Sequence, residues 1–432
     1  MTIEQIHSLF INSDGISTDT RKLVPNTLFF ALKGDNFNGN KFAAQALLEG
    51  CSYAIIDEKE FAVSEKYILV ENVLKTLQDL ANYHRKQFNI PVIGITGSNG
   101  KTTTKELMGA VLATTYNTLI TEGNLNNHLG VPFTLLRLTM DHEIAIIEMG
   151  ASKPGDIKEL AEIAEPTHGI ITNIGAAHIE GFGSLQGVIN TKTELYHFIE
   201  KTGGTIFVHA ADETLMKHLP ATTPVIGYGT SDGTINGAIT ALTPQVHFTW
   251  NETPLAGNPY TSSVVKSNLV GNYNFTNFLA AICIGRYFNV THEAINDALS
   301  NYIPSNKRSQ IEKTKRNTLI VDCYNANATS MMAALENFVA IPHEKKMAIL
   351  GDMLELGPIS KEEHQKIADY LADKNLDVVL IGQEFGNVTS TFKKFTHVSE
   401  LLAEKSLATL QDHLILVKGS RGIKLELVLP EL

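Results

Sequence analysis

The decisive stretch of this sequence is Pro91-Val-Ile-Gly-Ile-Thr-Gly-Ser-Asn-Gly-Lys-Thr-Thr-Thr104. Its apolar run Val92–Thr96 predicts a buried strand, which Pro91 separates from the preceding segment. The strand leads into a glycine-rich turn, and Lys101-Thr102 then opens a helix. Glycines let backbone N–H groups converge on phosphate oxygens, and the N-terminus of the helix adds its positive dipole. The stretch therefore predicts a site for the phosphates of a nucleotide.

Two side chains of this loop have expected roles. Lys101 would reach the outer phosphates, and the hydroxyl of Thr102 would ligate magnesium. A strict phosphate loop has a further glycine five residues before Gly100, where Ile95 stands, so the pattern here is TG-x-x-GKT. A glycine turn with a surface lysine is the alternative interpretation. The ordered succession of strand, glycines, Gly-Lys-Thr and helix argues against it.

Composition restricts the class of protein. The 432 residues correspond to about three domains at roughly 150 residues each. With 43% hydrophobic and 19% charged residues, the chain differs from disordered, collagen-like and coiled-coil proteins. The 35 basic and 46 acidic residues give a net charge of −11, so a nucleic acid is not expected as a partner.

Cysteine content and hydropathy indicate the cellular compartment in which the protein is expected. Cys51, Cys283 and Cys323 are too few and too scattered for a disulfide framework or a zinc site. The first residues, MTIEQIHSLFINSDG, lack the basic head and long apolar core of a signal peptide. No segment approaches the ~18 uninterrupted apolar residues that a membrane span needs. We therefore expect a cytoplasmic protein without membrane insertion and, because no coiled coil or long apolar edge demands a partner, a monomer.

The apolar runs predict an α/β protein of three domains, residues 1–88, 89–301 and 302–432. The first is a small α/β domain that ends in a connecting helix, Val73–Phe88. The second is a parallel-sheet domain of the P-loop ATPase type with a small antiparallel patch at Gly233–Trp250. The third alternates strands and helices like a doubly wound, Rossmann-like domain. The expected strands are Leu28–Ala31, Tyr53–Asp57, Tyr67–Val70, Val92–Thr96, Ile144–Glu148, Gly169–Asn173, Thr205–His209, Leu319–Cys323, Met347–Leu350, Val378–Ile381 and Leu414–Val417.

Three further side chains are candidates because ligands of open α/β sheets bind at the carboxyl ends of the strands. Glu148 ends an apolar run and stands where a second magnesium ligand is expected. His178 follows another strand end, and Lys192 lies in Asn190-Thr-Lys-Thr-Glu-Leu. Taken singly, each has an ordinary interpretation as a solvated strand end, a structural histidine or an exposed helix lysine.

Seven segments together resemble one known family, the Mur ligases, in the same order and over nearly the whole chain. They are TGSNGKTTT (96–104), GNLNNHLGVP (123–132), IEMGA (147–151), AAHIEGFGS (176–184), GNYNFTN (271–277), DCYNAN (322–327) and GDMLELG (351–357). Within the family, GNLNN, HIEGFGS, YNAN and GDMLELG resemble the members that add D-alanyl-D-alanine to a UDP-N-acetylmuramoyl-tripeptide. This implies ATP-dependent formation of an amide bond through an acyl phosphate, with release of ADP and phosphate, in peptidoglycan synthesis.

The resemblance implies roles at the matching positions. Catalytic roles fall on Lys101, Lys192, His178 and Arg308. Magnesium, with two ions expected, would be held by Thr102, Glu148, His178 and Lys192, the last as a carbamylated lysine. ATP would be bound by Gly97, Ser98, Asn99, Gly100, Lys101, Thr102, Thr103, Asn274, Asn277, Arg308 and Asp322. Tyr273 stands where the family usually has a histidine, and Cys323 stands where a serine is common.

The remaining expected contacts are with the two other substrates. Docking of the uridine nucleotide is expected at Ser17, Thr18, Asp19, Arg21 and Phe29, although Asn38-Gly39-Asn40 replaces the usual Asp-Gly-His that follows. The dipeptide acceptor is expected at Tyr324, Asn325, Asn327, Lys418 and Ser420. For Lys418-Gly-Ser-Arg421 a basic surface turn is an equally open interpretation.

Two other functions remain open at this stage. A phosphate-loop NTPase or kinase would account for residues 94–104 and Glu148 but would leave YNAN and GDMLELG without a role. A sibling Mur-type ligase that adds another amino acid is the second alternative, and GNLNN and GDMLELG disfavour it. No motif distinguishes diaminopimelate from lysine as the third residue of the peptide.

Overall fold

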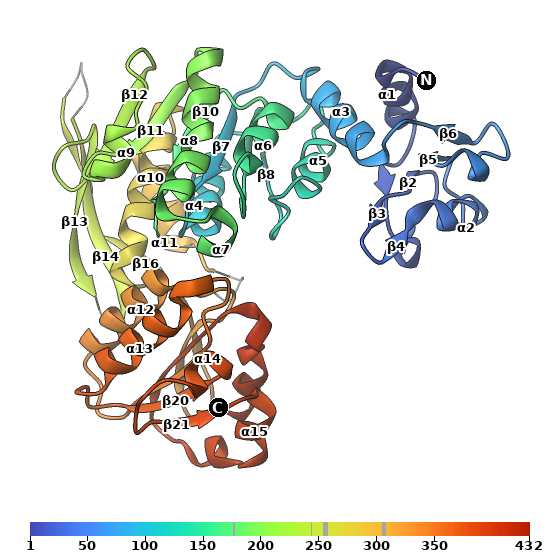
Figure 1. Ribbon diagram of the computed structural model, residues 1–432. Coiled ribbons are helices and arrows are strands. Elements are labelled where there is room, and N and C mark those ends of the chain that lie inside the picture. Colours follow the sequence, from blue (N-terminus) through green and yellow to red (C-terminus); the bar gives the residue numbers. More distant parts are fainter. Residues whose placement is uncertain (176–177, 243, 254–257, 305–307) are drawn as a thin grey trace. The chain divides into compact units, whose positions relative to one another are not determined.

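The computed structural model describes residues 1–175, 178–242, 244–253, 258–304 and 308–432 (Figure 1). Two expected motifs extend outside these residues, at Ala176-Ala177 and at Asn306-Lys307. The chain divides into two compact units, and strand β7 (Val92–Thr96) contributes residues to both. The first unit contains Met1–Gly94, Asn117–Met149 and Lys158–Thr167; the second contains Ile95–Tyr116, Gly150–Ile157 and His168–Leu432.

The N-terminal part of the first unit is a small α/β fold. Its parallel sheet has the order β1-β2-β5-β6, built from Ile16–Ser17, Leu28–Phe30, Tyr53–Ile56 and Tyr67–Leu69. A short antiparallel pair, β3 (Lys33–Gly34) and β4 (Phe37–Asn38), follows β2. Helices α1 (Ile3–Ile11) and α2 (Ala43–Leu48) complete this part. Phe29, Ala43 and Ala54 belong to its apolar core.

Helix α3 (Val73–Arg85) connects this part to the rest of the first unit. Asn72 caps it by accepting a hydrogen bond from the backbone of Lys75, and Leu77 and Leu80 are fully buried. The rest of the unit comprises strands β8 (Thr118–Ile120) and β9 (Ile144–Glu148), helix α5 (Gly130–Leu135) and most of α6 (Asp156–Ala164). In this unit β8 pairs with β9 in parallel, and β9 is the neighbour of β7 in the sheet.

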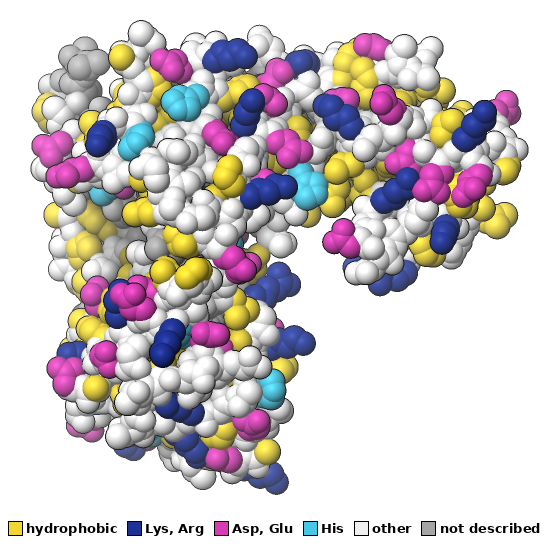
Figure 2. Space-filling model, viewed as in Figure 1, with side chains coloured by type: hydrophobic (Ala, Val, Ile, Leu, Met, Phe, Trp, Pro, Cys, Tyr) yellow, Lys and Arg dark blue, Asp and Glu magenta, His cyan; other side chains and the backbone are white. Residues whose placement is uncertain are grey.

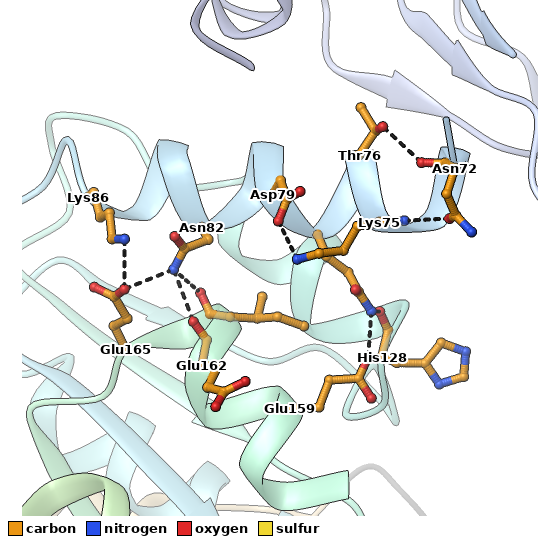
Figure 3. A network of polar contacts seen from close by, with 12 residues as sticks. Asn72, Lys75, Thr76, Asp79, Asn82, Lys86, His128, Glu159, Glu162 and Glu165 are labelled. Atoms are coloured by element: carbon orange, nitrogen blue, oxygen red, sulfur yellow. Dashed lines mark hydrogen bonds and ion pairs between the residues drawn. The ribbon is translucent and has the colours of Figure 1, made fainter. Parts of the chain in front are cut away.

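Polar contacts fasten α3 to the segments around α5 and α6 (Figure 3). Gln78 donates to the carboxylate of Glu159 at 2.8 Å and to the carbonyl of His128 at 3.3 Å. Asn82 donates to the carbonyls of residues 162 and 163 and to Glu165, which also pairs with Lys86. The connecting helix is therefore held by side chains as well as by its apolar face.

In the second unit a sheet begins at the end of β7 and runs through β10, β11, β12, β13, β14 and β15, with β16 paired to β14. The strands up to β13 are parallel, whereas β13 to β16 form an antiparallel patch. These strands are His168–Ile171, Thr205–His209, Val225–Gly229, Ile235–Leu242, Gln245–Glu252, Tyr260–Thr261 and Val265–Val270. The helices are α4 (Lys101–Leu112), α7 (Ile179–Phe182), α8 (Leu185–Thr202), α9 (Glu213–Lys217), α10 (Phe275–Tyr287) and α11 (His292–Asn301).

The C-terminal part of the second unit is a six-stranded sheet with the order β17-β18-β22-β19-β20-β21. Only β17 is antiparallel to its neighbour. The strands are Gln310–Lys313, Thr318–Asp322, Lys346–Gly351, Asp377–Ile381, Lys393–Phe395 and Leu414–Lys418, from β17 to β22 in chain order. The helices are α12 (Ala328–Ala340), α13 (Ser360–Leu371), α14 (Gln383–Gly386) and α15 (Val398–Ala403).

Apolar cores lie on both faces of this sheet, one against α12 and α13 and the other against α15. One core joins Leu350 and Leu416 to Leu335 of α12 and Ile367 of α13. The other joins alternate residues of the same strands, such as Ile349, to α15. Successive strand residues point to opposite faces, which explains why nearly continuous apolar strands are needed here.

The predicted strands are confirmed: three have the predicted bounds, and the boundaries of the others differ by one or two residues. The connecting helix ends at Arg85 rather than at Phe88. The doubly wound interpretation of the C-terminal part is confirmed, apart from the antiparallel edge strand β17, whose partly exposed residues carry little apolar signal. Among the described residues, no helix combines the length and apolar character needed to cross a bilayer. On the face drawn in Figure 2, basic and acidic side chains are interspersed.

Arg85, the last residue of α3, should contribute more to stability than Lys86, which follows it. Arg85 is 7% exposed, and its guanidinium donates to the carbonyls of Ala164, Phe88 and Glu165. We expect Arg85→Met to lower the free energy of unfolding by about 3 kcal/mol, because it leaves buried carbonyls without donors. The matched control Lys86→Met removes only an exposed ion pair, which should cost less than about 1 kcal/mol. Urea unfolding followed by circular dichroism measures both, and equal losses would contradict the assignment.

Candidate active site

The phosphate loop has a shape that only glycine permits at two positions. Gly97 has a φ of +148°, and a Cβ there would lie 1.9 Å from the hydroxyl oxygen of Thr172. Gly100 has a φ of +78° and precedes α4, and a Cβ there would lie 2.7 Å from the side-chain oxygen of Asn277. Both positions therefore combine a backbone that disfavours side chains with close neighbours. The glycines predicted from the sequence to form the phosphate cradle are required by the fold itself.

Asn99 is the most heavily anchored residue of the loop. Its backbone N–H donates to the side-chain oxygen of Asn173 at 3.0 Å. Its carbonyl accepts from the hydroxyl of Thr172 at 2.6 Å and from the side-chain amide of Asn173 at 3.0 Å. The adjacent Ser98 exchanges hydrogen bonds with the backbone of Gly175 at 2.9 Å. The segment after β10 thus holds the loop in place through several bonds.

Lys101 and the threonines after it form the first turn of α4. The ammonium of Lys101 donates to the carbonyls of Gly97 at 2.6 Å and Ser98 at 3.3 Å, so this side chain lies over the loop. Thr102 and Thr103 are 3% and 7% exposed. The first N–H groups of a helix lack partners within it, and they are suited to binding phosphate oxygens.

Asn274 and Asn277, expected to bind ATP, form hydrogen bonds that hold the helix following the loop. Asn277 accepts from the hydroxyl of Thr104 at 3.0 Å and donates to the side-chain oxygen of Asn274 at 2.9 Å, and both asparagines are buried. Tyr273, which replaces the family's histidine, is partly exposed and forms a hydrogen bond with the hydroxyl of Ser309 at 2.9 Å. These contacts join α10 to α4 and to the start of the C-terminal part.

His178 and Lys192 come from the segments around α7 and α8. Lys192 is 2% exposed, which excludes the interpretation as an exposed helix lysine. Burial, assisted by the charge of Lys101, holds the pKa of Lys192 well below its usual value. Burial also lowers the pKa of His178; Lys101 and Lys192 act in the same direction, whereas Glu355 opposes them. The Nδ1 atom of His178 lies 2.5 Å from a carboxylate oxygen of Glu355.

Two cations meet at Tyr324 in the C-terminal part. The guanidinium carbon of Arg308 lies 3.9 Å from the centre of the Tyr324 ring, and that of Arg421 lies 5.6 Å from it. The Nε atom of Arg308 is buried and has no hydrogen-bond partner among the described residues. Arg308 therefore carries a positive charge and an unused donor close to the predicted acceptor motif.

The expected acceptor residues Lys418 and Ser420 are both buried. The ammonium of Lys418 pairs with the carboxylate of Asp322, the residue expected to bind ribose. Ser420 accepts from the N–H of Leu354 and donates to the carbonyl of Ala326. The interpretation as a basic surface turn is therefore wrong for these two residues. Their side chains connect loops of the C-terminal sheet, because the strand end that carries them lies at its centre.

Asn327 contacts the phosphate loop directly. It caps α12 by accepting from the N–H of Ser330 at 2.9 Å, and its amide donates to the side-chain oxygen of Asn99 at 2.8 Å. The sequence predicted Asn327 on the acceptor side, across from the loop; the structure shows that it contacts the loop, and its role toward the acceptor stays a prediction. Asn325, in contrast, is exposed and its side chain accepts from the next backbone N–H.

The remaining candidates lie in the first unit. Glu148 is 1% exposed, accepts from the side-chain amide of Asn126 at 2.8 Å, and ends β9 as predicted. Asp19 and Arg21 form an exposed ion pair at 2.7 Å. Ser17 is buried and bonded to Thr27.

Thr18 is partly exposed, whereas Phe29 is 2% exposed and packs in the apolar core. The prediction that Phe29 contacts the uridine nucleotide is therefore corrected. The ring packs in the apolar core and supports the fold of this part of the chain. The position of Phe29 in a strand whose three residues are all buried accounts for an aromatic side chain there.

Each of the two units contains a side chain with an oxygen ligand of the kind that magnesium prefers, Glu148 in the first and Thr102 in the second. Magnesium usually keeps waters and binds substrate phosphates. Among the described residues, no three or more His, Cys, Asp or Glu side chains gather as a metal cage. A cation held jointly by one or two side chains and a nucleotide agrees with that arrangement.

Comparisons with known proteins agree along the whole chain. Three family models match consecutive segments: "Mur ligase family, catalytic domain" at residues 12–85, "Mur ligase middle domain" at 95–285, and "Mur ligase, glutamate ligase domain" at 307–421. The chain belongs to the Mur ligase family. The resemblance inferred from the seven motifs is thereby confirmed.

Two relatives with similarity over nearly the whole chain carry the same description. UDP-N-acetylmuramoyl-tripeptide–D-alanyl-D-alanine ligases of Bacillus subtilis and Escherichia coli are each 34% identical, covering 97% and 96% of this chain and 93% of each relative. A crystal structure of MurF from Acinetobacter baumannii has a TM-score of 0.87 at 30% identity, covering 100% of this chain and 98% of that one. MurF ligase from Thermotoga maritima in complex with ADP has a TM-score of 0.86 at 27% identity, covering 96% of both chains.

Three features of the Mur ligase site were missed by sequence reasoning. Thr172 and Asn173, which hold the phosphate loop, were interpreted only as a strand end. Glu355 was read only as part of GDMLELG, and its contact with His178 joins loops far apart in sequence. Polar residues directly after predicted parallel strands were the available signal for Asn173.

Asn327→Asp separates the two roles of Asn327. Aspartate keeps the acceptor that caps α12 but loses the donor to Asn99 and places a carboxylate against an amide oxygen. We expect an unchanged unfolding midpoint and roughly tenfold increases in the KM for ATP and for the acceptor, since one hydrogen bond is worth about 1 kcal/mol or slightly more. Steady-state kinetics with the exposed variant Asn301→Asp as control measure this. An increase in the KM for the acceptor alone would indicate that Asn327 serves only the acceptor.

Proposed function

We propose that this chain joins D-alanyl-D-alanine to a UDP-N-acetylmuramoyl-tripeptide at the cost of ATP, giving the pentapeptide precursor of peptidoglycan. The observation that carries the proposal is the hydrogen bond between Asn327 and Asn99, which joins the YNAN motif to the phosphate loop. A phosphate-loop NTPase has no need of such a contact. The relatives described above carry the same activity in their names.

Amide formation from a carboxylate in water is uphill, so the carboxylate must first be activated. An oxygen of the tripeptide carboxylate attacks the γ-phosphorus of ATP, the bond from phosphorus to the bridging oxygen breaks, and ADP leaves. The free amine of D-alanyl-D-alanine then attacks the acyl carbon, loses a proton, and displaces phosphate. The first step depends mainly on positioning and on neutralising charge.

Two polyanions must approach one another inside a protein of net charge −11, so cations have to be concentrated locally. Lys101 lies on the phosphate loop, and Arg308 has a buried Nε without a partner among the described residues. We assign both to the phosphoryl group. Bound magnesium would supply further positive charge, with Thr102 and His178 of the unit that carries the loop as protein ligands.

The other substrates follow from the same assignment. The exposed Arg21 and the partly exposed Thr18 and Asp19 are proposed to contact the uridine nucleotide, and Tyr324 and Asn325 the dipeptide. Lys418 is proposed to act indirectly, by holding Asp322 for the ribose. We further infer a monomer that acts in the cytoplasm, without nucleic acid.

Dependence of ATP turnover on both co-substrates tests the proposed reaction. The purified chain should release ADP only when the tripeptide nucleotide and D-alanyl-D-alanine are both present. ADP release without D-alanyl-D-alanine would favour a kinase or NTPase, and release with another amino acid would favour a sibling ligase. Parallel assays with diaminopimelate and lysine tripeptides define the third residue of the peptide.

Lys101→Ala should abolish ligation while leaving the fold intact. One charged contact to a phosphoryl group in a closed site is worth several kcal/mol, so we expect a loss of about three decades in kcat or more. The coupled assay for ADP measures it, with circular dichroism to establish folding. Turnover near that of the unmodified chain would contradict the assignment of the nucleotide to this loop.

Lys192 is proposed to act as a carbamate. A buried ammonium beside Lys101 is unfavourable, which the lowered pKa of Lys192 reflects, and the neutral amine is the form that reacts with carbon dioxide. The carbamate would be an oxygen ligand for a second magnesium ion. We expect Lys192→Ala to be nearly inactive and to regain part of its activity with acetate or formate. Lys192→Glu should rescue only weakly, because its side chain is shorter than the carbamate.

The control for this experiment is Lys201→Ala, which removes an exposed lysine from the same helix. It should behave like the unmodified chain. Normal activity of Lys192→Ala in bicarbonate-free buffer would rule out the carbamate.

A further inference from the structure

The loop Gly351–Gly357 reaches from the C-terminal sheet to His178. It leaves β19 and ends at a short 3-10 helix, Gly357–Ile359. A carboxylate oxygen of Glu355 lies 2.5 Å from Nδ1 of His178. A carboxylate only accepts hydrogen bonds, so Nδ1 carries the hydrogen and Nε2 carries the lone pair.

The loop that carries Glu355 is held rigidly from within. The N–H of Met353 donates to Nε2 of His364 at 3.0 Å, and that of Leu354 donates to the hydroxyl of Ser420 at 2.9 Å. The preceding Asp352 accepts from the backbone N–H groups of Glu384 and Phe385 at 2.9 and 2.8 Å. Asp352, His364 and Ser420 are all buried. The position of Glu355 is therefore set by contacts of its loop with α13, α14 and the segment after β22.

The backbone at this contact is strained on both sides. Glu355 has a φ of +65° and His178 a φ of +53°, in the left-handed region that residues with a side chain seldom occupy. Close by, a Cβ on Gly357 would lie 3.2 Å from the Cβ of Glu180, so the two loops are packed against each other. Strain of this kind persists where the surroundings over-determine it, and it concentrates at functional sites.

We propose that Glu355 is a positioning residue for His178: it fixes the imidazole tautomer and ring so that Nε2 serves the magnesium–nucleotide complex. Histidines that bind metals usually donate their other ring N–H to such a carboxylate. Here the carboxylate comes from the C-terminal sheet and the histidine from the segment before α8. The inference rests on the proposed function, which makes His178 a magnesium ligand.

This assignment gives GDMLELG a task in nucleotide chemistry. Through this motif, metal binding at His178 would depend on the C-terminal part. The hydrogen bond from Asn327 to Asn99 is a second contact between the C-terminal part and the nucleotide site. Binding of the acceptor by Glu355 itself is the competing explanation, and the two differ in what a substitution changes.

Manganese serves as the spectroscopic probe for the metal. Binding of Mn2+ to the full chain with ADP is measured from the electron paramagnetic resonance signal of free Mn2+. We expect Glu355→Ala to weaken Mn2+ binding by about 10- to 100-fold. Glu355→Gln, whose amide oxygen can still accept from Nδ1–H, should lose only a few-fold. The control Glu362→Gln changes an exposed ion pair of the same part of the chain and should bind like the unmodified chain.

Kinetics of the same variants complete the test. Glu355→Ala should lower kcat and leave the KM for D-alanyl-D-alanine unchanged. Unaltered Mn2+ binding with a raised KM for the dipeptide would overturn the proposal in favour of direct acceptor binding. Because the side chain of Glu355 is 59% exposed, we expect both variants to fold, and Glu355→Gln decides the matter if the alanine variant does not. Failure of the unmodified chain to ligate would instead refute the proposed function, independently of Mn2+ binding.

Discussion

The close packing of the phosphate loop on the strand end beside it is the constraint on which the site depends. Gly97 leaves no room for a side chain against Thr172, and the backbone of Asn99 is bonded to Thr172 and Asn173 on both its N–H and its carbonyl. The protein's own contacts thus define the shape of the loop. A preorganised set of N–H donors pays little reorganisation when phosphate binds, and the side chain of Asn99 remains for Asn327.

Charge is distributed in agreement with this arrangement. The protein is acidic as a whole, yet Lys101, Lys192 and Arg308 all lie in the unit that carries the loop. Lys192 is buried with a lowered pKa, and Arg308 keeps a donor without a partner among the described residues, whereas Lys418 is neutralised by Asp322. Pairing with a carboxylate therefore distinguishes Lys418, which supports the fold, from Lys101 and Arg308, which we assign to the anionic substrate.

Much of the fold was predictable because its signals are local. The strand Val92–Thr96, the start of a helix at Lys101 and the alternation in the C-terminal part all follow from short-range patterns of apolar residues and glycines. The edge strand β17 escaped because its residues are half exposed. At the site, the phosphate loop was predictable, but the burial of Phe29, Ser420 and Lys418 was not, since it depends on neighbours from distant segments. The contacts of Asn327 with Asn99 and of Glu355 with His178 were missed for the same reason.

The transfer of an oxygen atom from the tripeptide carboxylate to phosphate tests the central claim most directly. The carboxylate that receives the acceptor is labelled with 18O at both oxygens, and the phosphate released during ligation is analysed by mass spectrometry. An acyl phosphate formed at this loop predicts one 18O atom in each phosphate and the other in the new amide. Unlabelled phosphate, with the pentapeptide still formed or with ADP released alone, would contradict the account.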